Sequence, residues 1–194
     1  MNSGIKKCRK INAWIIFTII LAIQVTALIG WGISKKGYFI DELFTYGLSN
    51  SDGWRIDFYD MYDNYLDNWH DPSMFHDYLT VQKDGRFDFA GVVENVSADV
   101  HPPVYFMLIH AICSLMPDVF TKWFGIMPNI LFFIITQCLL YILSRELFGT
   151  ESRSALVPAV IYGFSIGAIN SVLLIRAYMM LAMLCTLQLS LIHI

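Results

Sequence analysis

The stretch INAWIIFTIILAIQVTALIGWGIS, residues 11–34, contains no charged side chain. A helix needs about 20 mostly apolar residues to cross the ~30 Å hydrocarbon layer of a bilayer, so this stretch predicts a transmembrane helix. A secretory signal peptide would have a shorter apolar region, about 7–15 residues, followed by a small-x-small cleavage site. The stretch is longer and has no clear site of that kind, and we therefore predict an uncleaved signal anchor.

Three further segments, 123–144, 154–175 and 177–194, are also uncharged and apolar. The composition agrees, because 56% of the residues are hydrophobic and only 15% are charged, and the mean hydropathy is +0.54. These values are typical of an integral membrane protein. The sequence predicts an all-α polytopic membrane protein with about four transmembrane helices.

The basic residues predict the orientation of these helices. Four of the 13 lysines and arginines lie in residues 1–10, which should hold the N-terminus in the cytoplasm. Residues 35–122 then form an extracytoplasmic loop, and residues 145–153 form a cytoplasmic turn with two arginines. No eukaryotic retention signal is present, which fits a bacterial cytoplasmic membrane.

The extracytoplasmic loop is predicted to contain two juxtamembrane helices, at about 52–70 and 103–117. The first has aromatic residues at i, i+4, i+8, i+11 and i+15, which places them on one face of a helix lying in the membrane interface. They are Trp54, Phe58, Tyr62, Tyr65 and Trp69. The second includes the apolar run 104–116, which is short for a span. We predict that this run does not cross the bilayer, although a crossing segment is the alternative.

Other features of the loop bear on metal ions and partners. A second face of the first helix carries four aspartates, Asp60, Asp63, Asp67 and Asp71. This face is either exposed to solvent or supplies oxygen ligands for a divalent cation. The spacing is not that of an EF-hand, so the motif gives no support to the cation site, which stays the alternative. The four cysteines contain no C-x-x-C pair, and we predict neither a disulfide nor a zinc site. The net charge of −3 argues against nucleic acid as a partner.

Four short motifs follow one another along the chain. They are Asp41-Glu42, His101-Pro102-Pro103-Val104-Tyr105-Phe106, Leu143-Ser144-Arg145-Glu146-Leu147-Phe148-Gly149 and Arg176-Ala177-Tyr178. In their order and spacing, after a basic start and one span, they resemble the N-terminal part of the GT-C glycosyltransferases. This membrane superfamily includes the protein O-mannosyltransferases and the lipid A aminoarabinose transferases.

The resemblance implies an enzyme that transfers a sugar from a polyprenyl-phosphate carrier to a hydroxyl acceptor at the outer face of the membrane. The acceptor is a lipid, a protein or a cell-wall glycan. Asp41 matches the general base that takes the acceptor's proton during an inverting displacement. Glu42 cannot point the same way as its neighbour, and we assign it a supporting role in orienting the acceptor or a cation.

The leaving phosphate needs cationic groups or hydrogen-bond donors where its charge develops. His101 and Arg176 match positions where the family places such groups. For His101 the alternative is a helix-start residue in water, and for Arg176 it is an arginine that reaches out to the membrane interface. Tyr105 and Tyr178 are either phosphate donors or interfacial anchors.

Enzymes of this superfamily have more spans than the four predicted here, and the chain stops inside an apolar run at Ile194. We therefore expect 177–194 to be truncated, the chain to be an N-terminal portion, and the isolated portion to be inactive. A different class of function would explain the same features. In that alternative the chain is a non-catalytic membrane subunit or a small transporter with an acidic outer loop.

Overall fold

The computed structural model describes residues 12–51, 71–97, 101–149 and 153–193. Within these residues the secondary structure is entirely helical, without a strand. The basic N-terminus at 1–10, the aromatic helix predicted at about 52–70 and the aspartates of that helix before Asp71 lie outside the described residues. The predicted all-α class is confirmed for the part of the chain that the structure describes.

The first predicted span is helix α1, Ala13–Ser34. The side chain of Asn12 accepts a hydrogen bond from the Trp14 backbone N–H and so caps the helix at its start. At the other end, the Lys122 ammonium donates to the carbonyls of Ile33 and Lys35, which a helix end leaves without partners. The start of the second span thus stabilises the end of the first.

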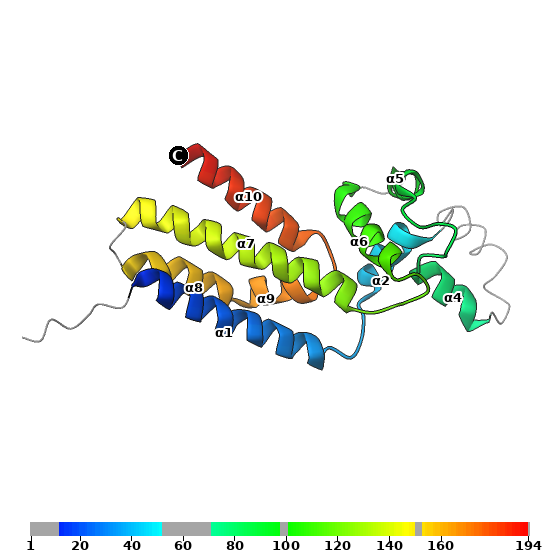
Figure 1. Cartoon of the computed structure of the whole chain (residues 1–194), viewed down its shortest axis with the longest axis horizontal. Helices are drawn as coiled ribbons and strands as arrows, with labels where there is room; N and C mark the ends of the chain where they lie inside the picture. The colour runs from blue at the N-terminus through cyan, green and yellow to red at the C-terminus, as the bar shows by residue number, and fades with distance from the viewer. Residues whose placement is uncertain (1–11, 52–70, 98–100, 150–152, 194) are drawn as a thin grey trace, which may run out of the picture.

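The second predicted span is helix α7, Trp123–Phe148, and it occupies the middle of the bundle. Figure 1 shows α1 and α10 running along it, and α1, α8, α9 and α10 all contact it. We predicted the span to end at residue 144 and a cytoplasmic turn to follow at 145–153. The helix continues to Phe148 and ends at Gly149, whose φ of 88° lies in the left-handed region that glycine favours.

The third predicted span, 154–175, is not one continuous helix. A 3-10 turn, η1 (Arg153–Leu156), leads into α8 (Val157–Gly163), and α9 (Ile166–Leu173) follows at an angle of 55°. The Ser165 hydroxyl accepts a hydrogen bond from the Ala168 backbone N–H and caps α9 as a new helix.

Polar side chains from other helices lie at this bend. The Gln24 amide in α1 donates to the carbonyl of Ala159, 3.1 Å away. A Cβ on Gly163 would lie only 2.2 Å from the amide nitrogens of both Gln24 and Gln137, so only glycine lets these amides approach the backbone so closely. The apolar character of the segment was predicted correctly, but the polar side chains that lie at its bend are distant from it in the sequence.

The last helix, α10 (Tyr178–His193), is 16 residues long and packs against α7. It is shorter than the about 20 residues that a span needs. Among the described residues, α1 and α7 are long and apolar enough to cross a membrane, and the bent pair makes a third if it counts as one span.

Four short helices gather at one end of the bundle, and we call them the helical cap (Figure 1). They are α2 (Ile40–Asn50), α4 (Pro72–Leu79), α5 (Phe89–Ser97) and α6 (Val104–Leu115). Helix α2 contacts the other three, and Leu48, Val92, Val96 and Phe106 form a small core among them. The Tyr46 hydroxyl donates to the Thr121 carbonyl, 2.8 Å away, and so ties the cap to the start of α7.

Candidate functional site

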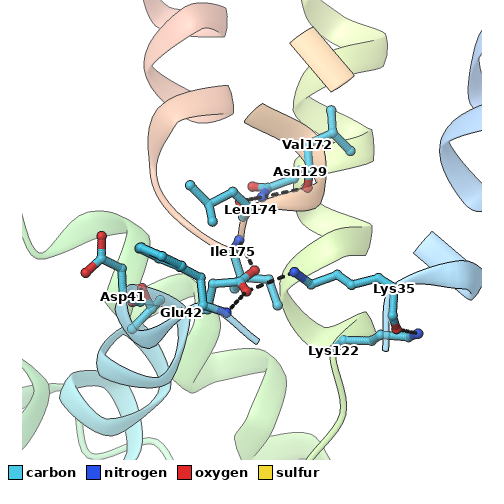
Figure 2. Close-up of polar contacts among 10 residues, drawn as sticks. Lys35, Asp41, Glu42, Lys122, Asn129, Val172, Leu174 and Ile175 are labelled. Atoms are coloured by element: carbon cyan, nitrogen blue, oxygen red, sulfur yellow. Dashed lines mark hydrogen bonds and ion pairs between the residues drawn. The ribbon is translucent and has the colours of Figure 1, made fainter. Parts of the chain in front are cut away.

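The acidic pair lies in the first turn of α2, where the helical cap meets the bundle. The two carboxylates point in different directions, as Figure 2 shows. Asp41 is partly exposed, whereas Glu42 is fully buried. A carboxylate buried to this degree must be paired or hydrogen-bonded, so the partners of Glu42 define the local structure.

Glu42 has partners on three sides. Its Oε2 accepts from the Lys35 ammonium at 2.9 Å and from the Phe39 backbone N–H at 2.7 Å. Its Oε1 accepts from the backbone N–H of Ile175, 2.8 Å away (Figure 2). Burial, followed by the negative charge of Glu42, raises the pKa of Tyr38 to about 12, so this phenol stays protonated at neutral pH.

Ile175 lies in the non-helical linker 174–177 between α9 and α10, and we call its first three residues the 174–176 segment. Asn129 in α7 donates to the carbonyls of Val172 and Leu174, at 3.2 and 3.1 Å. The same amide accepts from the Tyr105 hydroxyl at 3.1 Å. The segment is therefore held by side chains of the bundle on one side and of the helical cap on the other.

Arg176 is only 8% exposed, and its guanidinium lies against the start of α2. One of its nitrogens donates to the Asp41 backbone carbonyl at 3.2 Å and makes a longer contact of 3.5 Å with the Thr45 hydroxyl. Its other terminal nitrogen lies 2.9 Å from Nε2 of His101. Asp41, His101 and Arg176, which are far apart in the sequence, are thus brought together.

The contact between Arg176 and His101 defines the charge of the imidazole. A guanidinium carries only donors, so Nε2 of His101 must accept the hydrogen bond. An imidazole nitrogen that accepts carries no proton, and His101 is therefore neutral in this arrangement, with its proton on Nδ1. Arg176 supplies the positive charge at this point.

That positive charge has no carboxylate partner in the described part of the chain. The ion pairs there join Lys35 to Glu42, His76 to Asp77 and Lys83 to Asp118, with N···O distances of at most 4.0 Å. An arginine that is largely removed from water is stabilised by an anion, because burial without a counter-charge is costly. An anionic ligand at this point would provide such a counter-charge.

The remaining predicted residues lie at different depths. Tyr105 is buried, and its hydroxyl is hydrogen-bonded to Asn129, so it faces into the protein. Burial raises the pKa of this phenol. Tyr178 begins α10 and is half exposed. Across the described ranges, no group of three or more His, Cys, Asp or Glu residues is arranged to hold a metal ion.

Sequence reasoning missed three contributors to the site, namely Lys35, Thr45 and Asn129. Asn129 carried a visible signal, because an amide inside an otherwise apolar span is costly unless it has partners. Lys35 and Thr45 carried none, because a lysine after a span and a threonine in a short helix are ordinary.

Comparisons with known proteins were made on sequence and on structure. No protein-family model matches the chain, no curated protein matches it, and no solved structure matches it.

Proposed function

We propose that Asp41, His101 and Arg176 form part of the active site of a membrane glycosyltransferase whose sugar donor is a polyprenyl-phosphate carrier. The observation that carries the proposal is the buried Arg176 guanidinium, which lacks a carboxylate partner among the described residues and lies beside Asp41. A phosphate placed there would supply the missing negative charge through charge-assisted hydrogen bonds.

In the proposed reaction, Asp41 and Arg176 have separate tasks. The carboxylate of Asp41 takes the proton of the acceptor hydroxyl while its oxygen attacks the anomeric carbon of the sugar. The bond between that carbon and the carrier phosphate breaks, and the electron pair leaves with the phosphate. Arg176 stabilises the charge that develops there, and the displacement inverts the anomeric configuration.

The topology that we propose has four spans, α1, α7, the bent α8–α9 pair and α10. In it, α6 lies outside the bilayer core, the N-terminus is cytoplasmic, and the site faces outward from a bacterial cytoplasmic membrane. The hydrogen bond between His101 and Arg176 supports this arrangement, since a crossing α6 would put them on opposite sides. Helix α6 has only 12 residues, against 16 in α10, 22 in α1 and 26 in α7.

Carrier binding tests the proposal directly. The 194-residue chain would be placed in lipid nanodiscs and titrated with a fluorescent polyprenyl phosphate. Arg176→Gln should weaken binding about a hundredfold, because it removes the charge that pairs with the phosphate. Arg153→Gln, an exposed arginine in η1, is the matched control and should bind as the wild type does. Equal binding by all three proteins would refute the proposal.

A further inference from the structure

The two residues of the acidic pair have separate tasks, and the contacts of Glu42 indicate what its task is. We infer that Glu42 is a positioning residue that acts through the backbone of the 174–176 segment and so fixes Arg176 at the phosphate site. The inference rests on the proposed function, since it assigns Arg176 to the carrier phosphate. It replaces our sequence-based expectation that Glu42 orients the acceptor or a cation.

The carboxylate of Glu42 has little capacity left for a ligand. A carboxylate offers about four lone-pair positions, and here donors from Lys35, Phe39 and Ile175 occupy three of them. The side chain is also fully buried. An acceptor or a cation would have to displace a charged or main-chain donor before it could reach this group.

The bond to Ile175 is the contact that reaches across the fold. Lys35 and Phe39 lie within seven residues of Glu42, whereas Ile175 is 133 positions away, at the entrance to α10. Its N–H is not used by a helix, so a side chain must satisfy it. The Lys35 ammonium lies 2.9 Å from the same carboxylate, so the group that accepts from Ile175 is also part of an ion pair, and hydrogen bonds to ionic acceptors are the stronger kind.

The hydrogen bond from Ile175 to Glu42 is one arm that holds the 174–176 segment, and a second arm holds it from the bundle side. Asn129 in α7 donates to the Leu174 carbonyl and is itself oriented by the Tyr105 hydroxyl. Between these arms the chain folds tightly, because the Arg176 N–H donates to the Leu174 carbonyl at 2.8 Å. We call Glu42, Asn129 and Tyr105 the bracket, and together they hold residues 174 and 175, directly before Arg176.

The bracket limits where the guanidinium can lie. The Ile175 side chain also packs tightly against α7, where a Cβ on Gly125 would come within 2.1 Å of it. With residue 175 fixed by a hydrogen bond and by packing, the Arg176 side chain leaves the backbone toward Asp41 and His101. Loss of either arm frees the backbone, and the guanidinium then spends less time at the phosphate position.

A double-mutant cycle on carrier affinity separates positioning from direct contact. Glu42→Gln keeps the size of the side chain but removes its charge, and should weaken binding of fluorescent polyprenyl phosphate about tenfold. The same substitution on an Arg176→Gln background should change affinity by less than about twofold, because the residue it positions is already gone. Glu94→Gln, on an exposed face of α5, is the matched control and should change nothing.

A second variant of the bracket tests the same role, so the test does not depend on the folding of Glu42→Gln alone. Asn129→Ala leaves the acidic pair intact and should weaken carrier binding about tenfold, again without effect on the Arg176→Gln background. Asn170→Ala, an exposed asparagine in α9, is its control. Hydrogen exchange at the amide of Ile175 should become about tenfold faster in Glu42→Gln than in the wild type.

The outcomes distinguish the two proposals. If Arg176→Gln binds the carrier as the wild type does, the proposed function is wrong, and amide exchange at Ile175 alone decides whether Glu42 holds the segment. If Arg176→Gln weakens binding but Glu42→Gln has no effect, the positioning role is wrong. Additive losses in the double variant would also overturn it, because they would show that Glu42 contacts a ligand itself.

Discussion

The guanidinium of Arg176 donates to Nε2 of His101 across 2.9 Å, which makes the imidazole an acceptor in this contact. Replacement of His101 therefore tests whether carrier binding requires a hydrogen-bond acceptor at this position. His101→Gln offers an amide oxygen that can take the same hydrogen bond, and we expect carrier affinity within about threefold of the wild type. His101→Leu removes the acceptor and should weaken binding about tenfold. Titration in nanodiscs measures both, and equal losses in the two variants would contradict the neutral-acceptor assignment.

Asp41→Asn should abolish sugar transfer while it leaves carrier binding unchanged. The amide has no basic oxygen to take the acceptor's proton, and Arg176 contacts the backbone carbonyl of residue 41, which the substitution keeps. We expect at least about a hundredfold loss of rate. The longest gene product containing residues 1–194, assayed with a labelled polyprenyl-phosphate sugar, gives the rate.

The same variant separates an enzyme from a non-catalytic subunit. A subunit that uses its acidic loop for binding would tolerate Asp41→Asn with little change, because the side chain is partly exposed and its size is preserved. Unchanged transfer with normal folding would remove Asp41 from the mechanism.

Lys35→Gln should destabilise the fold, because it leaves the buried Glu42 carboxylate without its cation. The two side chains are 18% and 0% exposed, and the ammonium lies 2.9 Å from Oε2. Removal of one partner from a largely buried pair costs about 3 kcal/mol. Thermal unfolding in detergent micelles measures the loss. Lys36→Gln, at the exposed neighbouring position, should unfold as the wild type does, and equal stability of the two variants would show that the pair is unimportant.

Gly125→Ala should also be destabilising, for a steric reason. The added methyl group would lie 2.1 Å from Cγ2 of Ile175, so α7 and the 174–176 segment must move apart. Overpacking of this kind costs about 1–3 kcal/mol. Gly30→Ala is the control, because a methyl group there meets nothing within 4 Å, and alanine should stabilise α1 by about 0.5–1 kcal/mol. Chemical denaturation in micelles compares them, and a neutral Gly125→Ala would refute the close packing.

The long helices could be predicted from the sequence, and the breaks between them could not. The uncharged length of 11–34 was enough for α1, because a span is defined by local composition. At the bend between α8 and α9, Gln24 and Gln137 approach Gly163 from two other helices. Local hydropathy contains no information about such partners.

In the candidate site, likewise, the sequence indicated some residues but not their contacts. The resemblance selected Asp41, His101 and Arg176, and the structure brings them into contact. It also selected Glu42 but could not supply its role, because the partner of that carboxylate is a backbone N–H. Every residue except proline carries such a donor, so the identity of residue 175 could not reveal the contact.

The separation between Glu42 and Ile175 also bears on how the protein is made. Lys35 is synthesised before Glu42, so the ion pair can form as soon as α2 emerges. The Ile175 amide follows 133 residues later, about 7–27 s at ribosomal rates of about 5–20 residues per second. During that interval the nascent chain contains a charged pair that still lacks its last hydrogen-bond partner. We therefore expect the contact between Glu42 and Ile175, and with it the proposed phosphate site, to form late in biosynthesis, after α9 has entered the bundle.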